Sequence, residues 1–281
     1  MKDQTIVLRD GRKLGYSEYG NAKGKPIFFF HGTPGARNHP AAQIIESAVP
    51  FVRLFVVDRP GYGLSDPQKG RTLQDWNLDF SELLEHLNLS SFSIIAPSGG
   101  TPYAISISYF MPEKVEKTAI LCGVGPVYIP ELLEEMGEEE KSSIKAALYQ
   151  PELLEAFVAK VKENPVQYVN SLVEKMPKES QQKLTPAVIN GYTNLAIESS
   201  KTPYGMIDDG KIFGTPWNIP FEKIKVPIHF WHGDQDVNVP MSHAEYLSSK
   251  IPHAGLTRLE GLDHLTTTIH GLSPALNYLL E

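Results

Sequence analysis

The chain has very little cysteine. Among its 281 residues there is one, Cys122, so no disulfide can form within the chain. Because proteins of oxidising compartments usually carry paired cysteines, we expect a cytoplasmic protein. Cys122 closes the apolar run 119–122, which predicts a buried structural thiol rather than a reactive one.

The sequence also lacks an excess of positive charge and lacks long apolar runs. Lysine and arginine number 26 against 33 acidic residues, a formal net charge of −7, whereas nucleic-acid binding calls for a basic surface. No apolar run is long enough to cross a membrane, and residues 1–5 do not resemble a signal peptide. These absences predict a globular protein with neither nucleic acid nor membrane as partner.

What the sequence does contain is a series of short apolar runs bounded by turn residues. Runs at 6–8 and 13–19 flank Asp10-Gly11 and predict an antiparallel hairpin. Six later runs are almost wholly apolar, as in strands buried on both faces, at 26–30, 54–58, 93–96, 118–122, 227–231 and 256–259. Helical spacing of apolar residues follows at 73–87, after 98, at 241–250 and at 273–280. This alternation predicts an α/β fold whose parallel sheet is covered by helices on both faces.

Residues 125–221 differ in character from the rest. They are rich in glutamate and lysine, and they predict helices at 130–136, 141–149, 151–163, 166–175 and 186–198. Since this stretch begins after one strand and ends before the next, we interpret it as a helical cap inserted into a core of residues 1–124 and 222–281. Six glutamates between 131 and 140 are interpreted as a solvated helix face rather than a site for a cationic substrate.

Ser98 is the candidate nucleophile. It follows the strand at 93–96 and is flanked by small residues, Ala96 before it and Gly100 after it. A serine on a sharp strand-to-helix turn needs such neighbours. Pro97 has no N–H, which the last residue of a strand can tolerate. An ordinary loop can have the same composition, so the interpretation depends on the other loops.

The candidate base and acid follow two later strands. In a parallel sheet, functional residues lie just past the carboxyl ends of the strands. His264 follows the strand at 256–259 after a glycine turn, and we predict it to be the base. Asp234 and Asp236 both follow the strand at 227–231. Asp234, beside Gly233, is expected to shape the turn, so Asp236 is the predicted acid and Asp234 the alternative.

Two backbone N–H groups are needed to bind the oxyanion of an acyl-transfer reaction. The strand at 26–30 leads into the glycine-rich loop 31–35, His-Gly-Thr-Pro-Gly. Because Pro34 has no N–H, the predicted donor from this loop is Thr33. The second predicted donor is Gly99, the residue after the candidate nucleophile. The loop 58–66, which lacks the third glycine of a dinucleotide fingerprint, is predicted to brace the site with Arg59 and Asp66 in local ion pairs.

Together, the segments 31–35, 58–63, 96–100, 231–236 and 261–264 resemble the α/β-hydrolase superfamily, specifically its serine hydrolases with a helical cap. The resemblance implies a mainly parallel eight-stranded sheet with the cap inserted after the sixth strand. It implies Ser98 as nucleophile, His264 as base and Asp236 as acid, with Thr33 and Gly99 as oxyanion donors. No cofactor or metal is implied.

We therefore expect a serine hydrolase that cleaves a small to medium carboxylic ester through an acyl-enzyme intermediate. The alternatives are an aminopeptidase or amidase, since iminopeptidases use a similar His-Gly-x-Pro-Gly loop, a carbon–carbon bond hydrolase, and a slow-turnover ligand sensor. Eight large side chains of the cap either line an apolar pocket or, as we favour for any given one, pack the cap onto the core: Tyr128, Tyr149, Phe157, Tyr168, Met176, Tyr192, Met206 and Trp217.

Overall fold

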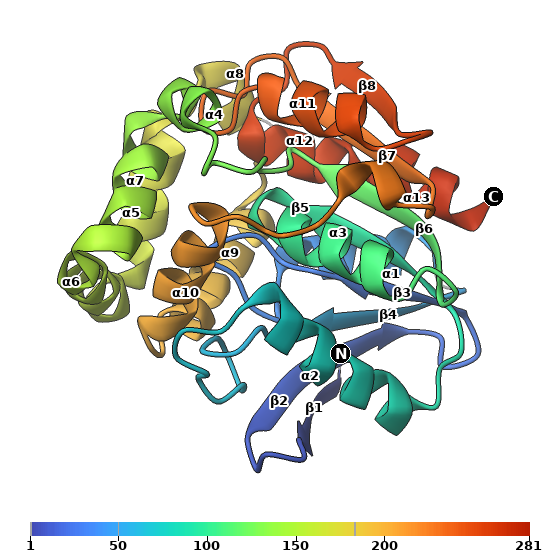
Figure 1. Cartoon of the computed structure of the whole chain (residues 1–281). Coiled ribbons are helices and arrows are strands. Elements are labelled where there is room, and N and C mark those ends of the chain that lie inside the picture. Colours follow the sequence, from blue (N-terminus) through green and yellow to red (C-terminus); the bar gives the residue numbers. More distant parts are fainter. Residues whose placement is uncertain (1, 50, 183) are drawn as a thin grey trace.

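An eight-stranded sheet lies at the centre of the computed structural model, which describes residues 2–49, 51–182 and 184–281 (Figure 1). The strands are β1 (Lys2–Val7), β2 (Lys13–Gly20), β3 (Lys25–Phe29), β4 (Val52–Val57), β5 (Phe92–Pro97), β6 (Val115–Leu121), β7 (Ile228–Gly233) and β8 (Gly255–Leu259). Each of these strands overlaps or adjoins a predicted one, which confirms the predicted α/β sheet.

The strands are arranged in the order β1-β2-β4-β3-β5-β6-β7-β8. The pairs β1–β2 and β2–β4 are antiparallel, as the predicted hairpin requires, and the five pairings from β4 to β8 are parallel. Parallel neighbours end at the same edge of a sheet. The loops that follow β3, β5, β7 and β8 therefore meet at one edge, although they are far apart in the chain.

The core has two halves, one on each face of the sheet. Successive strand residues point to opposite faces. Accordingly, Phe28 and Phe30 belong to the apolar cluster beneath α2 (Leu73–Leu87), α3 (Thr101–Phe110) and α11 (Ser242–Lys250). Ile27 and Phe29 belong to the cluster beneath α1 (Pro40–Ala48) and α13 (Leu272–Leu280). A sheet covered on both faces needs strands that are apolar throughout, and the six apolar runs meet that need.

The helices beside the sheet follow local signals to different degrees. Helix α2 has the bounds predicted from its apolar spacing, and Thr72 and Asp75 form a capping box at its start. Helices α1 and α12 (His264–His270) were not predicted. His264 was expected in a loop, but it is the first residue of α12, because Asp263 accepts a hydrogen bond from the N–H of Thr266 and caps the helix there.

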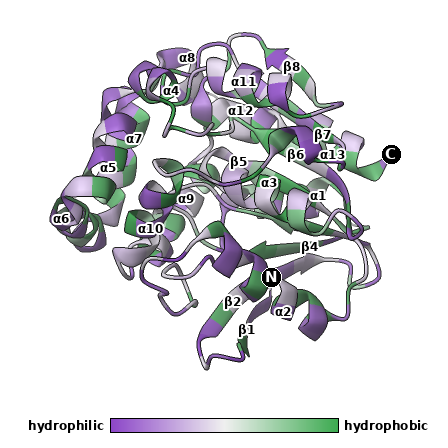
Figure 2. Ribbon diagram, in the orientation of Figure 1, coloured by the Kyte–Doolittle hydropathy of each residue, from purple (hydrophilic) through white to green (hydrophobic). Residues whose placement is uncertain are grey.

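The described residues between β6 and β7 form seven α-helices (Figure 1). These are α4 (Pro130–Glu135), α5 (Glu138–Tyr149), α6 (Pro151–Glu163), α7 (Pro165–Lys175), α8 (Lys178–Gln182), α9 (Pro186–Ser199) and α10 (Tyr204–Phe213). We call residues 125–221 the inserted segment. Figure 2 shows α5, α6 and α7 in mixed colours, whereas α3 and the central strands are mainly hydrophobic.

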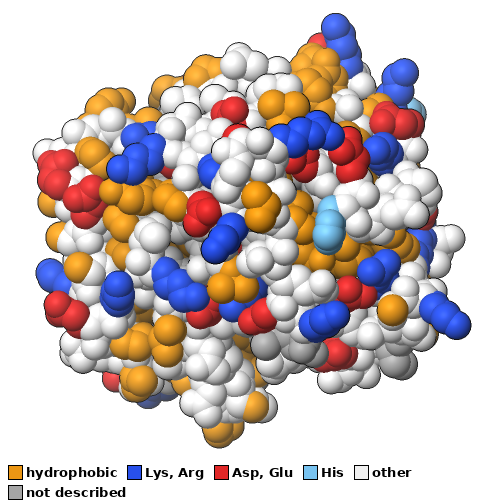
Figure 3. All heavy atoms as spheres, turned by 90° about the horizontal axis from the view of Figure 1, so that it is seen from below, with side chains coloured by type: hydrophobic (Ala, Val, Ile, Leu, Met, Phe, Trp, Pro, Cys, Tyr) orange, Lys and Arg blue, Asp and Glu red, His pale blue; other side chains and the backbone are white. Residues whose placement is uncertain are grey.

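The surface carries both signs of charge. Figure 3 shows Lys and Arg interspersed with Asp and Glu across one face of the molecule. Among the described residues, no helix has both the length and the apolar character needed to cross a bilayer.

Candidate active site

Ser98 lies where β5 turns into helix. A short 3₁₀ turn over Ser98–Gly100 joins Pro97, the last residue of β5, to α3. Ser98 has a φ of +50°, a left-handed conformation that costs energy for a residue with a side chain. A methyl group on Gly100 would lie 2.1 Å from the carbonyl oxygen of Phe30, so this position must be glycine. Ser98 is thus held at a tight turn with its side chain partly exposed.

The side chains of Ser98, His264 and Asp236 form one hydrogen-bonded line. His264 Nδ1 lies 2.7 Å from Asp236 Oδ2, and His264 Nε2 lies 3.0 Å from Ser98 Oγ. A carboxylate only accepts hydrogen bonds, so Nδ1 carries the proton and Nε2 accepts from the serine hydroxyl. The structure therefore brings together the three residues expected from the sequence, from the ends of β5, β7 and β8.

Asp236 is held in place from several sides. Its Oδ1 accepts hydrogen bonds from the N–H groups of Asn238 and Val239, at 3.0 and 2.9 Å. The buried side chain of His232, the fifth residue of β7, has Nε2 3.4 Å from Asp236 Oδ2 and 2.7 Å from the carbonyl of Val239. The contact with His232 was not expected from the sequence.

Asp234, the alternative acid, faces elsewhere. It accepts hydrogen bonds from the exposed Arg258 side chain and, at 2.8 Å, from the N–H of Gly261. It thereby joins the loops after β7 and β8. Of the two aspartates, Asp236 is the one that contacts His264.

The contact between Asp236 and His264 lowers the pKa of the carboxyl and raises the pKa of the imidazole, as a general base requires. Burial would raise the pKa of Asp236, but the charge of His264 and hydrogen bonds from the two neighbouring histidines hold that pKa well below its ordinary value. Burial would lower the pKa of His264, yet the Asp236 carboxylate outweighs burial and raises the pKa above 6.5. The imidazolium formed on proton uptake is therefore stabilised.

The two expected oxyanion donors lie side by side. A methyl group on Gly99 would come within 2.5 Å of Thr33 Oγ1, and one on Gly32 would lie 3.4 Å from the Cβ of Ser98. The loop 31–35 is therefore packed directly against the turn that carries Ser98.

Arg59 does not make the local ion pair expected for it. Its fully buried guanidinium donates to Asp209 of α10, with Nη2 2.5 Å from Oδ2. The ion pair expected for Asp66 is also not found among the described residues; its carboxylate accepts a hydrogen bond from the backbone N–H of Lys13 at 2.8 Å instead. The loop after β4 is thus bound to the inserted segment, because the packing of α10 supplies a carboxylate where the local sequence offers none.

A small apolar pocket of about 10 Å³ adjoins the loop that carries Thr33, and none of the three hydrogen-bonded residues lines it. It is lined by Pro34 of that loop and by Phe157, Val158, Val161, Tyr168 and Met206 of the inserted segment. Two hydroxyls, those of Ser199 and Ser200, also face it. Of the eight large side chains named above, three line this pocket, Trp217 packs in the main core and Tyr149 is 78% exposed.

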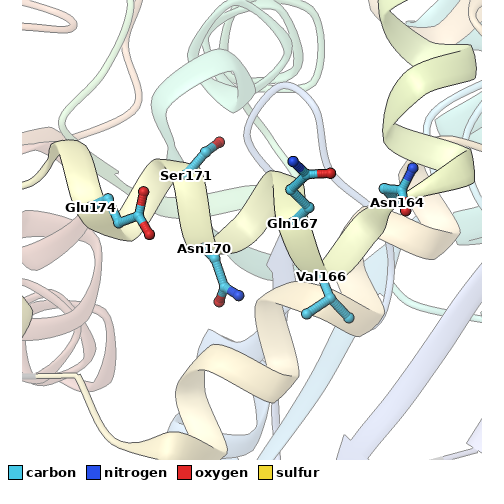
Figure 4. A pocket seen from close by; sticks show the side chains of 6 residues that line it. All are labelled: Asn164, Val166, Gln167, Asn170, Ser171 and Glu174. Atoms are coloured by element: carbon cyan, nitrogen blue, oxygen red, sulfur yellow. The ribbon is translucent and has the colours of Figure 1, made fainter.

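A second depression lies on the outside of the inserted segment, along α7. Figure 4 shows its lining: Asn164, Val166, Gln167, Asn170, Ser171 and Glu174. None of the three hydrogen-bonded residues lines it, so it is separate from the candidate site.

Cys122 lies beneath the three hydrogen-bonded residues, and its burial confirms the predicted structural thiol. Its Sγ, Asp236 and His264 offer ligand atoms within 4.8 Å of one another. Burial raises the pKa of the thiol, and metals bind the thiolate. Because Asp236 and His264 are also hydrogen-bonded to each other, the three groups are a poor metal site.

Comparison with known proteins places these features in context. The family model described as alpha/beta hydrolase fold matches residues 25–266. A non-heme chloroperoxidase of Streptomyces lividans is 25% identical, covering 95% of this chain and 94% of its own. A proline iminopeptidase of Neisseria meningitidis is 28% identical over 57% of this chain and 50% of its own. An esterase structure from Exiguobacterium antarcticum superposes with a TM-score of 0.71 at 19% identity, covering 99% of each chain.

Proposed function

This chain belongs to the α/β-hydrolase fold family, and on that premise we propose that it is a serine hydrolase that cleaves small to medium carboxylic esters. The observation that carries the proposal is the line of hydrogen bonds from Ser98 through His264 to Asp236. A nucleophile, a base and an orienting acid within hydrogen-bond reach are what acyl transfer requires.

In the proposed reaction, Ser98 Oγ attacks the ester carbonyl carbon while His264 Nε2 takes the hydroxyl proton. Asp236 stabilises the imidazolium through its hydrogen bond to Nδ1. The N–H groups of Thr33 and Gly99 bind the negatively charged oxygen. Collapse of this intermediate breaks the bond to the alcohol, which leaves with the proton from His264. Water, deprotonated by His264, then attacks the acyl carbon; the bond to Ser98 Oγ breaks, the acid is released, and Oγ takes back the proton from His264.

Support for an ester as the substrate comes from similarity of fold rather than from a pocket. The apolar space beside Pro34 has a volume of about 10 Å³, which is too small for an acyl or alcohol group, and none of Ser98, His264 and Asp236 lines it. The esterase from Exiguobacterium antarcticum shares the whole fold. We further propose that residues 125–221 act as a cap over a core of residues 1–124 and 222–281, because five apolar residues of this segment lie beside Pro34 and its Asp209 pairs with Arg59 of the core.

A second candidate function is cleavage of an amino-terminal amide bond. The proline iminopeptidase of Neisseria meningitidis matches about half of this chain. Glu140 of the inserted segment accepts a hydrogen bond from Asn238 beside Asp236, and its charge contributes to the raised pKa of His264. A carboxylate in that position is suited to bind the amine of a substrate.

The test is labelling and turnover with matched serine variants. Ser98→Ala should abolish labelling by a fluorophosphonate and lower kcat on p-nitrophenyl butyrate by up to about 10⁶-fold. Ser106→Ala, a buried serine of α3 that bonds Asn77, is the control and should retain both. Retained turnover in Ser98→Ala would refute the proposal. Faster cleavage of proline p-nitroanilide than of esters would favour the amide, and labelling without steady turnover would favour a ligand sensor.

A further inference from the structure

A buried cluster of charged and hydroxyl groups surrounds Asp209, which comes from α10 of the inserted segment. Its carboxylate accepts hydrogen bonds from both Arg59 and Arg71, each at 2.5 Å. Two tyrosine hydroxyls also donate to it, those of Tyr62 at 3.0 Å and Tyr103 at 2.5 Å. Asp209 and both arginines have no exposed side-chain area. The mechanism proposed above uses none of these four partners.

Arg59 connects this cluster to the loop 31–35 through hydrogen bonds. Arg59 donates to the carbonyl oxygens of His31, at 2.5 Å, and Gly32, at 2.9 Å. The ring of His31 lies with Nδ1 2.8 Å from the same Gly32 oxygen. Burial and the charge of Arg59 keep the pKa of His31 well below its ordinary value, so the ring is neutral. The Gly32 carbonyl is therefore fixed from two sides.

The fixed carbonyl determines the direction of a neighbouring N–H. The carbonyl of Gly32 and the N–H of Thr33 belong to one trans peptide group, in which the two bonds point in opposite directions. Because Arg59 and His31 hold the carbonyl, the N–H of Thr33 points away from Arg59. A rotation of this peptide would remove the N–H from the oxyanion position.

The side chain of Thr33 is also hydrogen-bonded to this cluster. Thr33 Oγ1 donates to Asp209 Oδ2 at 2.5 Å and accepts from Arg59 Nη2 at 3.0 Å. Both the backbone and the side chain of Thr33 are thus tied to Asp209, either directly or through Arg59. The Asp209 carboxylate therefore accepts hydrogen bonds from both Thr33 Oγ1 and Arg59.

We propose that Asp209 is a positioning residue for the oxyanion site, which it serves by holding Arg59 and Thr33 so that the Thr33 N–H faces the reacting carbonyl. The inference rests on the proposed serine-hydrolase function and deepens it. It makes α10 of the inserted segment part of the catalytic apparatus, in addition to any role in covering the substrate.

The packing of α10 fits this role. A methyl group on Gly205 would lie 2.7 Å from ring atoms of Tyr62, and one on Gly210 would lie 2.5 Å from the Cβ of Ala147. Glycine at these two positions lets α10 approach both the loop after β4 and α5 closely. Asp209 is brought within reach of Arg59 by that approach.

The test compares variants by kcat per active site, with sites counted by fluorophosphonate titration and p-nitrophenyl butyrate as substrate. Asp209→Asn and Thr33→Val should each lower kcat about 10- to 100-fold, less than the 10²- to 10³-fold of a donor removed outright. KM should stay within about threefold, because a misaligned oxyanion donor weakens the transition state more than the bound substrate. Thr33→Ser, which keeps the hydroxyl, should restore kcat.

Asp208→Asn is the matched control, since Asp208 is the buried neighbour of Asp209 on α10 and accepts a hydrogen bond from Gly70 instead. It should leave kcat within about twofold, and the acid limb of the pH profile should be unchanged in all variants because His264 and Asp236 are untouched. If Asp209→Asn does not fold, the Thr33→Val and Thr33→Ser pair decides.

Two results would overturn the inference. Wild-type kcat per titrated site in Thr33→Val, or a raised KM at constant kcat, would show that the cluster does not position the donor. Both leave the serine-hydrolase proposal standing. Failure of the wild-type protein to be labelled at Ser98 would instead refute the proposed function, and the inference with it.

Discussion

Two buried aspartates of this protein contact side chains of different chemistry. Asp236 contacts the imidazoles of His264 and His232, whereas Asp209 contacts the guanidinium groups of Arg59 and Arg71. Burial by itself would raise the pKa of both carboxyls, and the charges beside them lower both. Both sites therefore use a buried aspartate whose charged form is stabilised by neighbouring charges.

The difference lies in what the partners can do. An imidazole gains and loses a proton near neutral pH, while a guanidinium stays charged. The charge beside Asp236 can therefore change during a reaction, and the charge beside Asp209 is permanent. The first arrangement suits proton transfer and the second suits fixed geometry, so partner chemistry rather than burial sets the role of each aspartate.

The largest effect that would test this contrast is loss of activity in Asp236→Asn. An asparagine amide can present its N–H₂ to His264 and favours the wrong tautomer, so kcat should fall by about 10⁴-fold. The measurement is kcat on p-nitrophenyl butyrate, normalised to folded protein. A fall of less than about tenfold would show that Asp236 does not orient the histidine.

The next effect is on stability and concerns Asp209→Asn. Removing the carboxylate leaves two buried guanidinium groups short of a partner, which should lower the free energy of unfolding by about 3–5 kcal/mol. Urea denaturation of this variant and of Asp208→Asn is the measurement. Burial raises the pKa of Asp208, so a neutral amide should be tolerated there. Equal losses in both variants would contradict a special role for the arginine pair.

A smaller effect is the pH dependence of activity. His264 acts as a base only when it is neutral, and Asp236 raises its pKa. Wild-type kcat/KM should therefore rise with pH through a midpoint above 6.5. In Asp236→Asn the imidazolium loses its anionic partner, so the midpoint should move to lower pH. Profiles of kcat/KM over about pH 5–9 measure both. If the midpoint of the kcat/KM profile is unchanged in Asp236→Asn, a group other than His264 controls the acid limb of the profile.

The smallest effect is expected for Asp234→Asn. Asp234 lies two residues from Asp236, but its hydrogen bonds go to the exposed Arg258 and to Gly261. Exposed ion pairs contribute little to stability, so kcat should stay within about twofold and the urea midpoint should barely move. A loss of activity matching that of Asp236→Asn would show that the acid has been assigned to the wrong aspartate.

Much of the fold was predictable because its signals are local. The six apolar runs predict the parallel strands, and the spacing of Leu73, Trp76 and Phe80 predicts α2 with its observed bounds. The loops that carry Ser98 and His264 follow from the same pattern, because strand ends define where parallel loops meet. The start of α12 at His264 was missed, although Asp263 and Thr266 offer a capping signal.

Helix α10 was not predictable in this way. Gly205 and Gly210 lower its helix propensity, and the helix is stabilised by close packing against Tyr62 and Ala147. Asp209 has no motif around it, and its partner Arg59 is 150 residues away in the chain. A local ion pair was therefore the natural expectation for Arg59, and it was wrong.

By itself, the sequence determined the kind of sheet, the order of the strands along the chain, and which loops offer a serine, a carboxylate and a histidine. Apolar periodicity and turn residues act within a few positions, so they are legible without the fold. Only the tertiary structure decided that Asp236 rather than Asp234 contacts His264, and that Asp209 joins Arg59 to Thr33. Those contacts depend on how distant segments of the chain pack. Because an unpaired buried charge costs free energy, each buried charge pairs with a group that this packing brings beside it.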